Sequence, residues 1–269
     1  MCSSDLVDFN SSVNSAVNKL IASGLAFGLN RHRTSNLWFD RNFWTTSNDG
    51  LDLLPNRKPS EGIDSILDNT SKNYAFECAG YCQLVILSAM RLAYGADKFD
   101  NYIKSTKKAF RLSAYSSTGI KISETYTGEI DGTFVKEESN PKPNQPIISK
   151  PLDEVLNNAP IGSRILFRNF KISELLANPE KKPKETAIAR EILYSGWQLE
   201  NSIKVGEDKF AAHGISKKSK PTLSAADIKK TLFDIFHKRI GFDEGESEQQ
   251  FIDDYIKIGQ IAMYDTKIY

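Results

Sequence analysis

The octapeptide Tyr74-Ala-Phe-Glu-Cys-Ala-Gly-Tyr81, followed by an apolar run from Leu84 to Leu92, determines how the rest of this chain is interpreted. The apolar run predicts a buried helix that begins near Cys78 and ends near Gly95. The first turn of a helix carries the positive end of the helix dipole and backbone N–H groups, which stabilise a thiolate and can bind an oxyanion. Cys78 is therefore a candidate nucleophile, and the alternative is an inert thiol packed in a core.

Two further candidate site residues, Glu200 and His213, lie far downstream of Cys78. A nucleophilic cysteine near a helix start, with a histidine roughly 130–150 residues later, is the chain order of papain-like thiol enzymes. The segments on either side of Gly206-Glu207 have the pattern of two strands, and glycine at the first turn position suits a type II′ turn. That register places Glu200 directly opposite His213 on one face of the sheet. A shift of the turn by one position would make the pair diagonal.

Three short segments in this order resemble the bacterial spore-coat-type transglutaminases, the protein-glutamine gamma-glutamyltransferases. Phe76-Glu-Cys-Ala79 resembles the nucleophile motif of that family. Trp197-Gln-Leu-Glu-Asn201 is similar to its Trp-x-x-Glu-Asn segment, and Gly206-Glu-Asp-Lys-Phe-Ala-Ala-His-Gly214 to its histidine segment. Weaker matches include Pro59-Ser60 and Gly95 with Asp97-Lys-Phe99.

The resemblance implies an α+β fold with a papain-like (NlpC-like) thiol-enzyme core. We expect the helix that carries Cys78 to pack on a mostly antiparallel sheet that carries Glu200 and His213. Cys78 would attack a glutamine side chain, release ammonia and pass the acyl group to a lysine or another primary amine. The division of roles between Glu200 and His213 stays open, and Glu77 is either an auxiliary acid or base or a member of a structural ion pair.

The expected partners are proteins that bear glutamine and lysine, and we expect neither a cofactor nor a metal. Alternative functions remain. Water could resolve the same thioester, which gives a glutamine deamidase, and related thiol folds hydrolyse peptides. Either enzyme could act on a foreign protein as an effector or toxin. A different class of protein is an interaction module that kept the fold and lost its activity.

Composition narrows the classes of partner. The 269 residues carry a formal net charge of +1, so no global charge favours nucleic acid or an anionic membrane. The three cysteines are too few for a disulfide scaffold. No apolar run approaches the length of about 18 residues that membrane insertion needs, and no standard signal peptide is visible. We expect a cytoplasmic protein, or one delivered without a cleavable signal peptide, and the resemblance allows an association with spores.

The secondary-structure pattern predicts one catalytic domain over residues 1–269 with two additions. The first is a Pro-rich inserted loop at 136–151, and the second is a helical C-terminal segment at 223–263. Strands are expected between Leu112 and Phe134 and at Arg164–Arg168. Residues 177–185 are expected to form a solvated loop, and residues 186–215 strand-like pieces.

Overall fold

The computed structural model of the protein describes residues 8–27, 39–46, 50–68, 74–113, 117–128, 131, 133–137, 147–240 and 247–267. The chain forms two compact units. The first unit comprises Met1–Ile122, Ser216–Thr222 and Tyr264–Tyr269, and the second unit comprises Ser123–Ile215 and Leu223–Met263. The prediction of one catalytic domain stays a prediction, because two compact units can belong to one domain.

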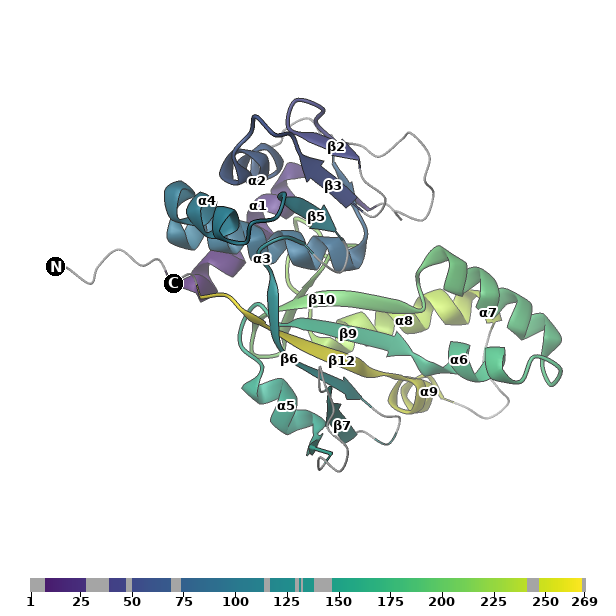
Figure 1. Cartoon of the computed structure of the whole chain (residues 1–269). Helices are drawn as coiled ribbons and strands as arrows, with labels where there is room; N and C mark the ends of the chain where they lie inside the picture. Colours follow the sequence, from purple (N-terminus) through teal and green to yellow (C-terminus); the bar gives the residue numbers. More distant parts are fainter. Residues whose placement is uncertain are drawn as a thin grey trace. The chain divides into compact units, whose positions relative to one another are not determined.

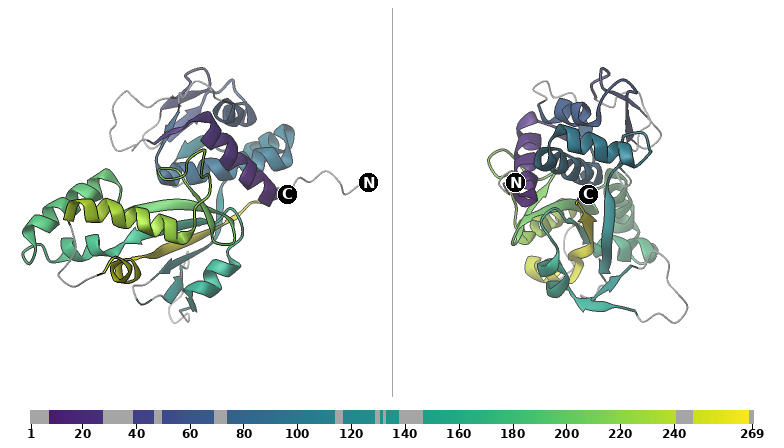
Figure 2. Two further views of the ribbon diagram at one scale, coloured as in Figure 1. Left: turned by 180° about the vertical axis from the view of Figure 1, so that it is seen from behind. Right: turned by 60° about the vertical axis from the view of Figure 1, so that its left-hand side comes forward.

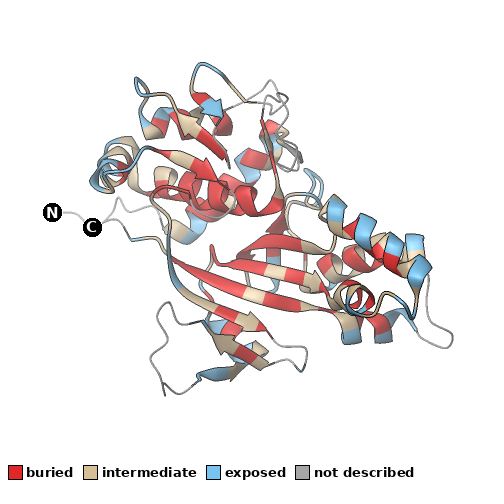
Figure 3. Ribbon diagram, turned by 45° about the vertical axis from the view of Figure 1, so that its right-hand side comes forward, coloured by how far each residue is buried: buried red, intermediate tan, exposed pale blue. Residues whose placement is uncertain are grey.

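The helices of the first unit surround α3 (Cys78–Tyr94), which is buried along almost its whole length (Figure 3). A helix that is apolar all round is typical of a core position. α1 (Phe9–Ser23) packs along α3, and α2 (Pro59–Leu67) and α4 (Ala96–Ser105) contact it as well (Figures 1 and 2). Gly95 ends α3 with a positive φ of 79°, a conformation that glycine adopts without a steric cost. The helix predicted from the apolar run is therefore confirmed.

Two small sheets complete the first unit. β2 (Trp44–Thr46), β3 (Gly50–Leu53) and β5 (Arg111–Ser113) form an antiparallel sheet in the order β2-β3-β5. β1 (Ala26–Phe27) and β4 (Ala75–Phe76) form a short parallel pair. Because β4 ends two residues before Cys78, this pairing fixes the chain directly ahead of α3.

The second unit contains most of a seven-stranded sheet in the order β11-β10-β9-β12-β6-β7-β8. The pairs β11–β10, β10–β9, β9–β12, β6–β7 and β7–β8 are antiparallel. The strands are β6 (Lys121–Gly128), β7 (Thr133–Lys136), β8 (Ser149–Pro151), β9 (Arg164–Asn169), β10 (Leu199–Gly206), β11 (Lys209–Ala212) and β12 (Ile256–Asp265). The mixture of helices and a mainly antiparallel sheet agrees with the predicted α+β class.

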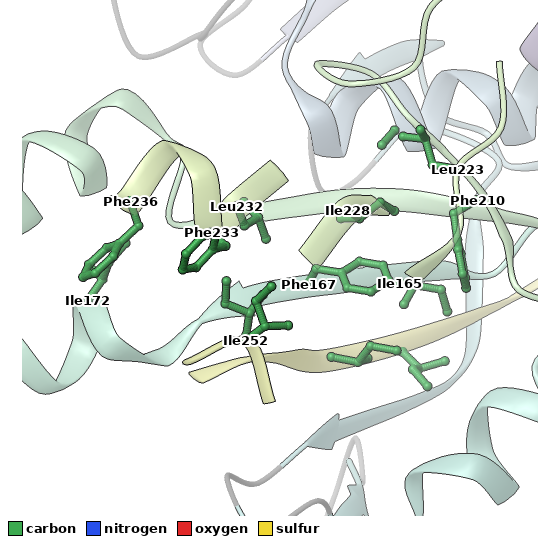
Figure 4. Close-up of a cluster of buried hydrophobic side chains, with 14 of the residues drawn as sticks. Ile165, Phe167, Ile172, Phe210, Leu223, Ile228, Leu232, Phe233, Phe236 and Ile252 are labelled. Carbon is green, nitrogen blue, oxygen red and sulfur yellow. The ribbon is translucent and has the colours of Figure 1, made fainter. Parts of the chain in front are cut away.

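The helices of the second unit are α5 (Leu152–Asn158), α6 (Phe170–Ala177), α7 (Pro183–Ser195), α8 (Ala225–Ile240) and α9 (Glu248–Tyr255). α8 packs on β9, β10 and β11, and its apolar side chains meet those of the strands in one buried cluster (Figure 4). The rings of Phe167 and Phe210 lie edge to face at 5.6 Å. Burial of such aromatic side chains is a main source of the stability of a unit of this size.

Two elements of the second unit differ from the sequence prediction. The segment 186–215 was expected to be strand-like, but its first part is helix α7, which Pro183 begins and Gly196 ends in the left-handed conformation. The segment 223–263 was expected to hold two helices, at 223–240 and 249–263. The first agrees with α8, but the second is the short helix α9 followed by strand β12, which lies between β9 and β6. Pairing on both sides of β12 outweighs the helix-like spacing of its apolar residues. None of the helices in the described part of the chain is both long and apolar enough to cross a membrane.

The Pro-rich segment 136–151 connects two paired strands rather than lying wholly outside the sheet. β7 and β8 pair in antiparallel register, with Thr133 opposite Pro151 and Val135 opposite Ser149. Residues 138–146, which carry three of the four prolines of this segment, lie outside the described residues. β8 is the edge strand of the seven-stranded sheet.

Candidate functional site

Cys78 is the first residue of α3, as its sequence context predicts. Its side chain is only 7% exposed, and its Sγ donates to Oε2 of Glu77 at 4.0 Å. One turn further along α3, Cys82 is fully buried. The two thiols therefore differ in position: Cys78 lies at the helix start beside a carboxylate, whereas Cys82 lies in the interior of the helix.

Glu77 is the N-cap of α3. Its carboxylate accepts the backbone N–H of Ala79 at 2.9 Å and, in a second short hydrogen bond, the backbone N–H of Gly80. A negative charge at this position also interacts favourably with the helix dipole. The sequence analysis expected the backbone N–H groups of the first turn to be able to bind an oxyanion. The N–H groups of Ala79 and Gly80 already donate to the carboxylate of Glu77. An oxyanion role for the first turn therefore stays a prediction in which these two amides already have an acceptor, and a role of Glu77 as acid or base stays a prediction as well.

Glu200 lies in β10 of the second unit and is only 1% exposed. It is opposite Phe167 of β9, so its side chain belongs to the same sheet face as Phe167 and Ser202. Lys204 belongs to this face too, and its Nζ donates to the carbonyl oxygens of Leu156 and Ala159 at 2.7 and 2.8 Å. Burial lowers the pKa of Lys204 below its ordinary value. Three buried polar side chains, Glu200, Ser202 and Lys204, thus lie on a face that also carries the apolar Phe167.

His213 directly follows β11, which ends at Ala212. The observed register pairs Ser202 with Ala212 and Gly206 with Lys209, with an irregularity between Lys204 and Gly206. The turn residues are Glu207 and Asp208, so Gly206 is not the first turn residue, and the predicted opposition of Glu200 and His213 is wrong. Ala212 is opposite Ser202 and therefore shares the sheet face of Glu200, whereas His213 lies in the turn that follows β11.

Asp208 is a residue that sequence reasoning missed. It adopts a left-handed conformation with a φ of 40°, and its Oδ1 accepts the backbone N–H of Ala225 at 3.0 Å, at the start of α8. Asp is among the few residues that tolerate this conformation. The turn between β10 and β11 and the start of α8 are therefore held together by one side chain. Asp208 and Ala225 are 17 residues apart, so no local sequence pattern indicates this contact.

The candidate residues fall into two groups. Glu77 and Cys78 belong to the first unit, and Glu200 and His213 belong to the second unit. Trp197, which the sequence also singled out, packs against the apolar cluster of the second unit. Among the described residues, no group of three or more His, Cys, Asp or Glu side chains is arranged to hold a metal ion. The catalytic assignment of Cys78, Glu77, Glu200 and His213 stays a prediction.

The comparison with protein families agrees with the class of protein to which the motifs point. Residues 5–122 match the model of the protein-glutamine gamma-glutamyltransferase family, and this part of the chain contains Glu77 and Cys78. The resemblance predicted from the motifs is thereby confirmed. The match ends before Glu200 and His213 and spans less than half of the chain.

A solved structure extends the likeness in fold to most of the chain. The chain resembles a transglutaminase from Geobacillus stearothermophilus, determined without its C-terminal extension, with a TM-score of 0.57 and 20% sequence identity. The likeness covers 96% of this chain and 90% of that one. No curated protein matches the chain. At this level of identity the solved structure shows the shared fold alone.

Proposed function

We propose that this protein is a protein-glutamine gamma-glutamyltransferase with Cys78 as its nucleophile. One observation carries the proposal: Cys78 begins a buried helix, within the part of the chain that matches the transglutaminase family, and its thiol donates to the carboxylate of Glu77. A buried cysteine with a purely structural role needs neither the helix start nor the adjacent carboxylate. Cys82 lies in the interior of the same helix, not at its start.

The reaction proceeds in two acyl transfers. The thiolate of Cys78 attacks the side-chain carbonyl carbon of a protein glutamine, the carbon–nitrogen bond breaks, and the nitrogen takes up a proton and leaves as ammonia. The amine of a lysine then attacks the thioester, a new amide bond forms, and the thiolate leaves. The first step needs a group that gives a proton to the leaving nitrogen, and the second needs a group that takes one from the amine.

Glu200 and His213 are the groups that we assign to these proton transfers. In this proposal the fold has a papain-like core, in which the helix of Cys78 packs on the sheet that carries Glu200. Support comes from the resemblance of Trp197-Gln-Leu-Glu-Asn201 to the family's Trp-x-x-Glu-Asn segment, and Glu200 is held in the sheet with only 1% of its surface exposed. The substrates in this proposal are proteins that bear glutamine, and the acceptors are lysines or other primary amines.

The test is mass spectrometry of a glutamine-rich protein incubated with the enzyme, with and without a primary amine. We expect incorporation of the amine with release of ammonia. The Cys78→Ala variant should lose this activity completely, because it lacks the thiol that forms the thioester in this mechanism, whereas the folded Cys82→Ala variant should keep most of it.

Other outcomes of this experiment would replace the proposal. Conversion of glutamine to glutamate at saturating amine would identify a deamidase, and cleavage of the peptide chain would identify a protease. Equal losses in the Cys78→Ala and Cys82→Ala variants, both folded by circular dichroism, would show that the nucleophile is misassigned. An unmodified substrate under all conditions would favour an interaction module.

A further inference from the structure

A cavity of about 860 Å³ lies in the first unit, between the connection from β3 to α2 and the helix α4 with the segment that follows it. We call it the α4 groove. Its lining comes from residues 53–59 and from residues 97–110. Pro59 and Asp97, which belong to two of the weaker family resemblances, are among the lining residues. The chemistry proposed for Cys78 makes no use of them.

The floor of the α4 groove is apolar and firmly held. Leu53, Ile103 and Phe110 line it, and Ile103 and Phe110 are only 2% and 5% exposed. The backbone N–H of Leu53 donates to the carbonyl oxygen of Phe110 at 2.9 Å, so the two lining segments are joined directly. Phe99 packs edge to face on Phe110 at 6.1 Å and supports it from the core side. The floor is therefore pre-formed, as binding cavities usually are.

The rim of the groove is basic. Lys58, Lys104 and Lys108 line the cavity with exposed side chains, and none of the three makes an ion pair with any residue that the structure describes. Arg57 also lines the groove, but its Nε donates to the carbonyl oxygen of Asn42 at 2.9 Å and its guanidinium lies over the ring of Phe43. The three lysines are thus available to an anionic partner.

The acidic residues of the rim leave this excess of positive charge in place. Both carboxylate oxygens of Asp100 are engaged with Ser60 at the start of α2, one with its backbone N–H at 2.7 Å and one with its hydroxyl at 2.8 Å. Asp97 lies in the first turn of α4, where a carboxylate complements the helix dipole. Asp97 and Lys104 each complement one end of the α4 dipole, and Asp100 is engaged with Ser60. The lining still holds four basic side chains, Arg57, Lys58, Lys104 and Lys108, against two acidic ones.

We propose that the α4 groove binds an acidic segment of the glutamine-bearing substrate protein, with one apolar side chain on the floor and flanking carboxylates at Lys58, Lys104 and Lys108. The proposal rests on the proposed function, because it treats the partner as the substrate of Cys78. The cavity is much larger than a single small anion needs, and an apolar floor inside a basic rim fits an extended peptide that carries both kinds of side chain.

The experiment measures binding without catalysis, by fluorescence anisotropy with the full-length Cys78→Ala variant. The probe is a labelled peptide with a central leucine flanked by aspartate and glutamate, compared with the same peptide in which glutamine and asparagine replace the acids. We expect the acidic peptide to bind more tightly, with an affinity that falls as salt rises. The triple variant Lys58→Glu, Lys104→Glu, Lys108→Glu should weaken binding by about tenfold or more at low salt.

Two matched controls separate the groove from a general effect of charge or size. The variant Lys181→Glu, Lys184→Glu, Lys218→Glu makes the same change in net charge at three exposed lysines elsewhere and should bind as the parent does. Ala109→Trp fills the exposed edge of the groove and should weaken binding with every charge intact. The equivalent Ala187→Trp, at an exposed site on α7, should have no effect.

The possible results separate this proposal from the proposed function. If both triple variants lose binding equally, or if an oligonucleotide of equal charge binds as tightly and responds to the same variants, the proposal is wrong. With an active enzyme, the groove variants should raise the KM for an acidic glutamine substrate and leave kcat unchanged. If the enzyme incorporates the amine but no peptide binds to the groove, the proposed role of the α4 groove is wrong and the transglutaminase assignment still holds.

Discussion

The side chain of Glu77 serves two neighbours at once, the first turn of α3 and the thiol of Cys78. Its carboxylate accepts from the backbone of Ala79 and Gly80 and from Sγ of Cys78. A helix cap and a catalytic carboxylate make different demands, since a cap needs only an acceptor oxygen whereas an acid or base needs a group that titrates. Substitutions at this residue can therefore separate the two roles.

We expect Glu77→Ala to lower the free energy of unfolding by about 1 kcal/mol, because α3 loses its N-cap. Glu77→Gln keeps an acceptor oxygen and should cost less than half as much. Urea unfolding measures the stability, and ammonia release measures the chemistry in the same two variants. If Glu77→Ala unfolds at the same urea concentration as the parent, the cap described for α3 does not contribute to stability. If Glu77→Gln is stable but slow in ammonia release, the carboxylate has a chemical role beyond the cap.

Glu200 and His213 present a second question at the scale of the residue, because the observed register removes the sequence argument that they face each other. We expect both Glu200→Gln and His213→Gln to slow ammonia release. The loss should be about 100-fold for a residue that transfers a proton and smaller for a residue that only positions another group. The variant with the larger loss identifies the residue that exchanges a proton with the substrate. A parent-like rate in both folded variants would exclude both residues from the reaction.

At the scale of the element, the start of α3 could be predicted from the local sequence, whereas the register of the β10–β11 hairpin could not. The start of α3 could be predicted because the cap, the thiol and the apolar run are contiguous in the chain. The hairpin register could not, because the irregularity between Lys204 and Gly206 moves the turn by one residue. The strand β12 could not be predicted for a different reason: its partners β9 and β6 are distant in sequence.

Asp208 connects two of these elements, and its substitution tests how firmly the hairpin is held. Asp208→Ala should lower the free energy of unfolding by about 2 kcal/mol, because the variant loses the acceptor for Ala225 and places a Cβ-bearing residue without a local hydrogen bond at a φ of 40°. Asp208→Asn keeps both the acceptor and the tolerance for this conformation, so it should cost much less. Urea unfolding of the pair provides the measurement. Equal losses in the two variants would show that the negative charge, rather than the geometry, is what matters.

At the scale of the whole molecule, the position of β12 makes the seven-stranded sheet depend on the last part of the chain. The order of the strands in the sheet differs from their order in the sequence, because β12 lies between β9 and β6. β9 also pairs with β10, the strand that carries Glu200. Its side chains Ile256, Ile258 and Ile261 belong to the apolar cluster of the second unit and are at most 4% exposed. Only β9 therefore lies between β10, which carries Glu200, and β12 in the C-terminal segment.

Removal of the residues after Tyr255 should consequently unfold the second unit. Burial of three isoleucines contributes roughly 5–9 kcal/mol, which is comparable with the whole net stability of a domain, and the deletion also leaves the edges of β9 and β6 unpaired. We expect the shortened chain to lose its cooperative urea transition and its ammonia release. Removal of Lys267–Tyr269 alone, which spares β12, should leave both intact. A shortened chain that still unfolds cooperatively at the parent's urea concentration would mean that β6 and β9 can pair without β12, and that the topology described for the sheet is not required for its stability.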